Sequence, residues 1–135
     1  MSFFKNTLYV SMITVVVISC SSIPLKSNID KEESPVVIAN DSLAYEIIII
    51  DPGFNVYLSS TARQRGYHSL KFLELKNRFY VSIWNQRVNN PSQFNPNIYE
   101  NIIHYNSFIN YGYEVNYLLF NYFEFAQRKY RMTLR

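Results

Sequence analysis

The sequence contains few of the residues on which recognisable active sites are built. It has one cysteine, so no disulfide can form within it, and its two histidines show no metal-site spacing such as HExxH. Its three glycines are too few for a phosphate-binding loop. No serine lies in a G-x-S-x-G motif, which argues against nucleophilic catalysis. We therefore expect no metal, no cofactor and no enzymatic activity.

Charge is also scarce in this chain. Thirteen Lys and Arg stand against ten Asp and Glu, which gives a net charge of +3. A balance this close to neutral indicates neither nucleic acid nor an acidic substrate as the partner. Aromatic residues are abundant instead, with 12 Tyr and 10 Phe but a single Trp. A length of 135 residues corresponds to one domain.

Residues 1–19 have the pattern of a secretory signal. Lys5 precedes an apolar core over residues 8–18, which is shorter than the roughly twenty residues that a membrane-spanning helix needs. The sequence Val-Ile-Ser-Cys at 17–20 resembles a bacterial lipobox, in which the cysteine is lipidated and becomes the new N-terminus. We predict that Cys20 carries acyl chains, since two or more chains anchor a protein stably. The alternative is an uncleaved N-terminal anchor with a buried cysteine.

The residues after Cys20 bear on where the protein resides. By the same resemblance, Ser21 takes the place of the aspartate that retains lipoproteins in the inner membrane, which favours the outer membrane. Residues 20–44 are polar and interrupted by Pro24 and Pro35, so they are predicted to form a flexible tether that includes the short apolar run at 36–38. An acidic cluster at 30–33 raises the possibility of surface display, but the periplasmic face is favoured.

Residues 45–135 are predicted to form the globular domain. The β-branched run at 45–50 predicts a strand buried on both sides. Residues 69–90 contain no glycine or proline and are apolar around most of a helical wheel, which predicts a central helix covered from several sides. The other expected elements are helices at 53–64 and 113–132 and a second strand at 101–105. The expected fold is α+β, a small two-stranded sheet packed with three helices in the order β-α-α-β-α.

Four charged residues form a candidate cluster. Lys76 and Arg87 are eleven positions apart, so they lie on nearly one line of the central helix, within its apolar arc. Long cations in such a place extend to water or find carboxylates. Glu100 and Glu114 are the expected partners, in salt bridges that would hold the following loop and the last helix. The functional alternative is a cationic groove for an anionic ligand.

Aromatic residues crowd the second half of the chain beside many asparagines. Rings and amides together are the side chains that bind sugars, by stacking and hydrogen bonding, and we mark Trp84, Tyr99, Tyr111 and Tyr113 as a candidate aromatic surface. The same residues also suit a small core in which each buried tyrosine hydroxyl needs a partner. Both interpretations remain open from the sequence.

Four segments of the domain carry a family resemblance. They are IIDPGF at 49–54, WNQRV at 84–88, NPNIYE at 95–100 and YGYEVNY at 111–117. As a set they resemble a family of small Bacteroidota lipoproteins of unknown function, over residues 45–134. The resemblance implies a lipidated envelope protein with an α+β domain, and it implies no activity.

The expected function is therefore that of a lipid-anchored envelope protein that acts through contacts with another protein and does not bind nucleic acid. The main alternative is a glycan- or peptidoglycan-binding module that uses the aromatic surface. A third hypothesis is a hydrolase that uses His104 with Glu100 or Glu114.

Overall fold

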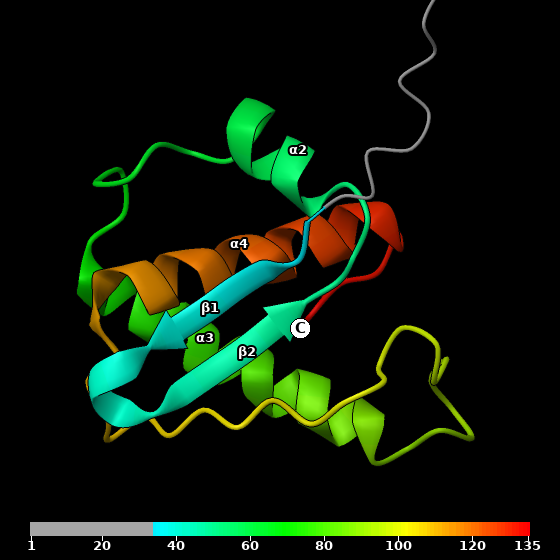
Figure 1. Ribbon diagram of the computed structural model, residues 1–135. Helices are drawn as coiled ribbons and strands as arrows, with labels where there is room; N and C mark the ends of the chain where they lie inside the picture. The colour runs from blue at the N-terminus through cyan, green and yellow to red at the C-terminus, as the bar shows by residue number, and fades with distance from the viewer. Residues whose placement is uncertain (1–33) are drawn as a thin grey trace, which may run out of the picture. The chain divides into compact units, whose positions relative to one another are not determined.

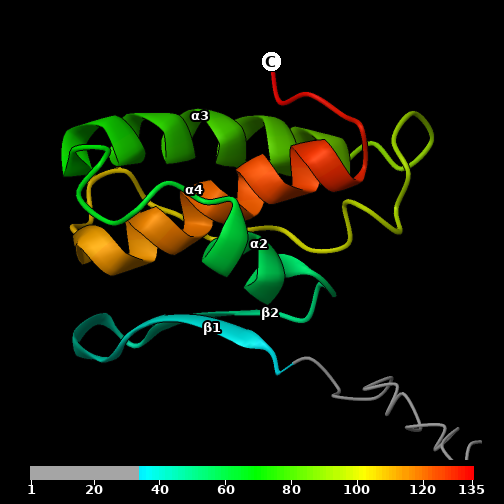
Figure 2. The ribbon, with the colours of Figure 1, turned by 90° about the horizontal axis from the view of Figure 1, so that it is seen from above.

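The computed structural model describes residues 34–135, which form one two-stranded antiparallel sheet and three α-helices (Figure 1). Seen from above, the sheet, the pair α2 and α4, and α3 lie in successive layers (Figure 2). The predicted α+β class, with one two-stranded sheet and three helices, is confirmed. The elements are β1 (Val36–Asn40), β2 (Tyr45–Ile49), α2 (Phe54–Ser60), α3 (Leu70–Val88) and α4 (Gly112–Lys129).

The order of the elements is β-β-α-α-α, so the predicted order β-α-α-β-α is wrong. β1 and β2 form a hairpin in which Val36 lies opposite Ile49 and Asn40 opposite Tyr45. Residues 36–38 therefore belong to the fold and not to the predicted tether. A run of three apolar residues is too short to reveal a period by itself, yet Ile38 is fully buried and Val37 is exposed, as alternation along a strand requires.

The second predicted strand, at residues 101–105, is also wrong, because its backbone is bound by side chains of α3. Asn85 accepts a hydrogen bond from Ile103 N–H at 2.9 Å and donates one to the carbonyl of Ile103 at 2.8 Å. The indole N–H of Trp84 donates to the carbonyl of Asn101 at 3.0 Å. A segment whose polar groups are satisfied in this way does not pair with the sheet.

The central helix is α4, and the prediction that residues 69–90 occupy this place is wrong. Seven consecutive residues of α4, 115–121, are buried, because α4 contacts β1 and α2 as well as α3. On α3, by contrast, Leu75 is 55% exposed and Phe79 is 50% exposed. A single stripe of α3 is buried in the core, and the other apolar residues of that helix are half-buried at its border or, like Leu75 and Phe79, exposed.

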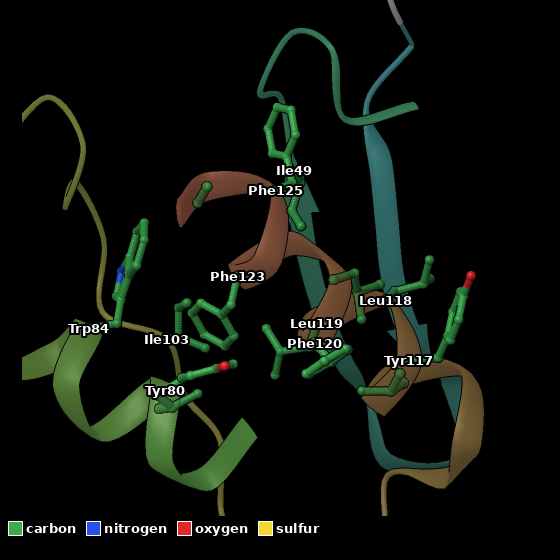
Figure 3. Close-up of a cluster of buried hydrophobic side chains, with 14 of the residues drawn as sticks. Ile49, Tyr80, Trp84, Ile103, Tyr117, Leu118, Leu119, Phe120, Phe123 and Phe125 are labelled. Carbon is green, nitrogen blue, oxygen red and sulfur yellow. The ribbon is translucent and has the colours of Figure 1, made fainter. Parts of the chain in front are cut away.

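Aromatic packing joins α3 to α4. The fully buried ring of Phe123 lies with its centroid 5.6 Å from that of Tyr80 and 5.8 Å from that of Trp84 (Figure 3). Such tilted and edge-to-face contacts each stabilise by about 0.5–1.5 kcal/mol beyond the area they bury. Most of the aromatic residues of the sequence thus serve the core.

A polar link also crosses between these two helices. Asn77 and Asn116 are both fully buried, and Asn77 donates from Nδ2 to the carbonyl and to Oδ1 of Asn116, at 2.9 and 3.0 Å. The hydroxyl of Tyr105 donates to the same Oδ1 at 2.7 Å, and Asn116 Nδ2 donates to the carbonyl of Gly112 at 2.8 Å. Both asparagines are therefore fixed in position by bonds that apolar neighbours cannot supply.

The helices α2 and α3 begin in different ways. Ser69 caps α3 by accepting a hydrogen bond from Phe72 N–H at 3.3 Å. Gly53 occupies the cap position of α2 with φ +95°, and α2 ends at Ser60, before the predicted end at residue 64. Within the described residues, none of these helices is long and apolar enough to cross a bilayer.

Candidate functional site

A pocket of about 350 Å³ lies beside β2, along the edge of that strand that is not paired with β1, and no further strand of the described part of the chain pairs there. Four consecutive residues, Ile47 to Ile50, line it. Because side chains of a strand point alternately to its two faces, a pocket that touches all four lies along the edge of the strand. Its volume is near the lower end of the roughly 300–1,000 Å³ found for ligand pockets.

The opposite wall of the pocket is held by α3. It includes Trp84, Asn101 and Ile103, which the hydrogen bonds from Trp84 and Asn85 fix in place. In Figure 1 the chain that follows α3, drawn in yellow and including residues 101–103, runs past β2 on the side away from β1. The pocket is therefore bounded on one side by an unpaired strand edge and on the other by residues 101–103, in which both backbone groups of Ile103 and the carbonyl of Asn101 are hydrogen-bonded to α3.

The charged residues that line this pocket are both acidic. Asp51 pairs with Nζ of Lys129 and accepts a hydrogen bond from the hydroxyl of Tyr130 at 2.9 Å, and Lys129 also donates to the carbonyl of Pro52 at 2.8 Å. Glu100 is exposed, and within residues 34–135 it forms no ion pair. The pocket thus presents one neutralised and one free carboxylate.

Two tyrosines of the pocket wall, Tyr122 and Tyr130, have a raised pKa. Burial raises the pKa of Tyr122, and the negative charge of Asp51 adds to that effect. Burial likewise raises the pKa of Tyr130 to about 12, with further contributions from its hydrogen bond to Asp51 and from the charge of that residue and of Glu100. Both phenols are therefore neutral hydrogen-bonding groups at physiological pH.

The predicted aromatic surface is wrong, because three of its four members are buried. Trp84 and Tyr99 pack edge to face with ring centroids 4.9 Å apart, and Tyr111 packs against Tyr45 at 4.3 Å. Tyr113 is half-buried and bridges the loop before α3, accepting from Gly66 N–H and donating to the carbonyl of His68. The core-packing alternative is what the structure shows for these rings.

The predicted cluster of Lys76, Arg87, Glu100 and Glu114 does not come together. Glu114 pairs with Arg65, whose Nε donates at 2.8 Å. Arg87 donates to neutral partners, the hydroxyl of Tyr99 and the carbonyl of Thr133, each at 2.6 Å.

Lys76 lies over the rings of Phe72 and Tyr80, with Nζ 5.9 and 5.7 Å from their centroids. It lines a second pocket, of about 420 Å³, together with Arg128 and Arg135. Among the described residues neither it nor Arg87 pairs with a carboxylate. Of the predicted four, only Glu100 lines the pocket beside β2.

The histidines lie apart from this pocket. His68 stacks on Phe72 with ring centroids 4.4 Å apart, and His104 is exposed. Within residues 34–135 no three His, Cys, Asp or Glu side chains are grouped so that they could hold a metal ion. Cys20, the predicted lipidation site, lies outside the described residues.

The pocket beside β2 was not predicted, because residues 45–50 were expected to form a strand that is covered on both faces. Ile48 is 55% exposed and Ile50 is 73% exposed, so that expectation is wrong. The sequence did contain a signal for this pocket: four consecutive isoleucines are followed directly by Asp51, so an apolar strand ends at a carboxylate. Tyr122 gave no signal, because its periodicity is that of any core residue of α4.

The comparisons with known proteins give one match. The model of a family of unknown function (DUF6146) matches residues 8–135, so it covers nearly the whole chain and confirms the predicted membership of an uncharacterised family. No curated protein and no solved structure matches the chain.

Proposed function

The chain belongs to this family of unknown function, and because the family brings no activity with it, we propose a role from the chain's own features. The protein is a lipid-anchored component of the cell envelope, held at the outer membrane by acyl chains on Cys20. Its folded domain is not an enzyme and acts by contact with another protein, from the periplasmic side. The lipobox-like sequence at 17–20 supports the anchor.

One observation supports the protein contact, namely the apolar outer face of the β1–β2 hairpin. Val37 and Ile48 lie directly opposite each other on this face and are 48% and 55% exposed. Ile50 continues the row, and Leu43 at the turn is also exposed. An antiparallel sheet with one covered face has polar residues on the other face as a rule, so an apolar outer face is a candidate interaction surface.

The polar residues in the core support a non-enzymatic role, because they serve the fold. Asn77 and Tyr105 each donate a hydrogen bond to Asn116, and Arg87 donates to Tyr99 and to the carbonyl of Thr133. The hydrolase hypothesis needed His104 beside Glu100 or Glu114, yet Glu114 is paired with Arg65.

The anchor is tested by metabolic labelling with palmitate in the native host. We expect label on the wild-type chain and its recovery with the outer-membrane fraction, because the thioether-linked lipid needs the thiol of Cys20. The variant Cys20→Ser is expected to lose the label entirely. A mature wild-type protein whose sulfur is unmodified by mass spectrometry would exclude the anchor.

The protein contact is tested by photo-crosslinking in intact cells, with a photoreactive amino acid in place of Ile48. We expect one discrete adduct, since Ile48 lies at the centre of the exposed apolar face. The matched control carries the same amino acid in place of Arg78, an exposed residue of α3, and is expected to give none. Equal adducts from both positions, or none from Ile48, would count against the proposed surface.

A further inference from the structure

We propose that the free edge of β2, with the pocket beside it, binds an extended peptide segment of a partner protein by strand addition, with a basic side chain of that segment facing Glu100. This inference rests on the proposed function only in that the partner is a protein. It adds the site, the mode of binding and the chemistry of the segment.

The backbone of β2 is available for pairing on this side. In the described part of the chain, no hydrogen bond joins the backbone of residues 47–50 to any group outside the β1–β2 pair. An unpaired edge is a row of donors and acceptors that another strand can complete, and a strand added in this way lies about 4.8 Å away. The pocket of about 350 Å³ lies along Ile47 to Ile50, on the edge where such a strand would add.

Residues 101–103, on the opposite side of the pocket, do not pair with the edge of β2 themselves. Both polar groups of the Ile103 backbone are bonded to Asn85, and the carbonyl of Asn101 accepts from Trp84. Residues 101–103 therefore lie near β2 without pairing to it. An incoming segment would add to β2 alone and would lie against Trp84 and Ile103.

The side chains around the edge define the chemistry of the segment. Ile48 and Ile50 are exposed and offer cross-strand neighbours for β-branched residues. Asp51 is neutralised by Lys129, whereas Glu100 is free among the described residues, and no basic side chain lines the pocket. Glu100 therefore selects a Lys or Arg, which places one cation among alternating apolar residues.

A second copy of the same chain is a poorer occupant of this edge. If two β2 strands paired edge to edge, each would bring the residues 45–50, Tyr-Glu-Ile-Ile-Ile-Ile. That stretch carries no basic residue, and its single charge, Glu46, has the same sign as Glu100. The charge pattern thus favours a different chain over self-association.

The test begins with a displayed library of random octapeptides, selected on the full chain. We expect enrichment of sequences in which every second residue is β-branched and which carry one Lys or Arg.

The best of these peptides is then synthesised and titrated against the chain by the fluorescence of Trp84, the sole tryptophan of the sequence and a member of the pocket wall. In Glu100→Gln the dissociation constant is expected to rise about two- to fivefold, as for an exposed ion pair. Glu74→Gln, on α3 and outside the pocket, is the matched control and is expected to bind as the wild type does.

Backbone methylation of the synthetic peptide tests strand addition directly. In an extended peptide, successive amides point to opposite edges, so the amides form two sets. N-methyl groups on one set are expected to weaken binding more than tenfold, and on the other set hardly at all, because only one edge of the peptide faces β2.

Equal tolerance of both sets, no enriched peptide, or enrichment without a basic residue would overturn the proposal. So would a Trp84 change produced by raising the protein concentration alone, since that result assigns the edge to a second copy. All of these measurements are independent of Cys20, so an unlipidated protein would overturn the anchor and leave the peptide site standing.

Discussion

Replacing Asn116 with alanine is expected to lower the free energy of unfolding by about 3 kcal/mol. The fully buried side chain of Asn116 accepts from Tyr105 and Asn77 through Oδ1 and donates to the carbonyl of Gly112 through Nδ2. Without it the Tyr105 hydroxyl loses its acceptor and Nδ2 of Asn77 keeps only the carbonyl of Asn116, whereas the carbonyl of Gly112 keeps the intrahelical bond from the backbone N–H of Asn116. A buried polar group without a partner costs about 1–3 kcal/mol, and the cavity left by the buried side chain adds to that loss.

The loss is measured by urea unfolding, followed by circular dichroism and by Trp84 fluorescence. For a domain of about this size, 3 kcal/mol corresponds to a fall of roughly 12–24 °C in Tm. Asn97→Ala is the control, because Asn97 is exposed and its removal is expected to change stability by less than about 0.5 kcal/mol. A loss below about 1 kcal/mol in Asn116→Ala would mean that the link between α3 and α4 is not what holds these helices in register.

The helices could be predicted from the sequence because local signals mark them. Ser69 caps α3 and Pro91 lies just past its end, and Gly112 begins α4. Between these points the apolar period is that of a helix, and no breaker interrupts it. What periodicity could not decide is which helix is central, since both α3 and α4 are apolar around much of their circumference. The central helix is the one with packed elements on both sides, and α4 has the sheet on one side and α3 on the other.

The hairpin could not be predicted, because its turn lacks the Asn-Gly or Asp-Gly pair that marks a β-hairpin. Residues 41–44 connect the strands, and Ala44 adopts the left-handed conformation, with φ 49°. That conformation is usual for glycine or asparagine, so an alanine there gives no hint of a turn. β1 has five residues and only Ile38 of them is fully buried, which is too little pattern to separate it from a linker.

The candidate site shows a similar limit. Charge patterns predicted that Arg87 would seek Glu100 or Glu114, yet its partners are a phenol and a backbone carbonyl, which no charge pattern reveals. For the aromatic residues the core-packing interpretation is correct and the candidate surface is wrong. The free edge of β2 depends on which strand pairs with it, and that in turn depends on Asn85 binding residues 101–103. Such competition for backbone groups is a tertiary effect.

Stability is expected to fall steeply above pH 10, because several tyrosines stay protonated in the folded chain. Burial is the main cause in each case: it raises the pKa of Tyr45 and Tyr122, and it raises the pKa of Tyr105 and Tyr130 to about 12. In the unfolded chain a tyrosine ionises near pH 10. Between about pH 10 and pH 12 the unfolded state therefore binds fewer protons than the folded state, and the free energy of unfolding falls as pH rises.

The size of this effect is large for a small domain. Each tyrosine contributes at most about 1.4 kcal/mol per pH unit, and less where water screens a half-exposed ring, so the four together give roughly 2–3 kcal/mol per pH unit. Between pH 10 and pH 12 the loss amounts to about 4–6 kcal/mol, which is comparable to the lower end of the roughly 5–15 kcal/mol by which domains are stable. Urea midpoints from pH 8 to pH 11.5, with phenolate absorbance at 295 nm, measure both the loss and its cause.

Tyr45→Phe separates this mechanism from a general effect of alkali. The hydroxyl of Tyr45 is buried and has no hydrogen-bond partner within residues 34–135, so its removal is expected to raise the free energy of unfolding by about 1 kcal/mol at pH 8. The same change removes one titrating group, so the loss per pH unit above pH 10 becomes smaller by up to about 1.4 kcal/mol. Tyr67→Phe is the control, because that ring is 63% exposed, and it is expected to leave the slope unchanged. If the slope in Tyr45→Phe equals that of the wild type, the buried phenol of Tyr45 is not among the groups that unfold the chain in alkali.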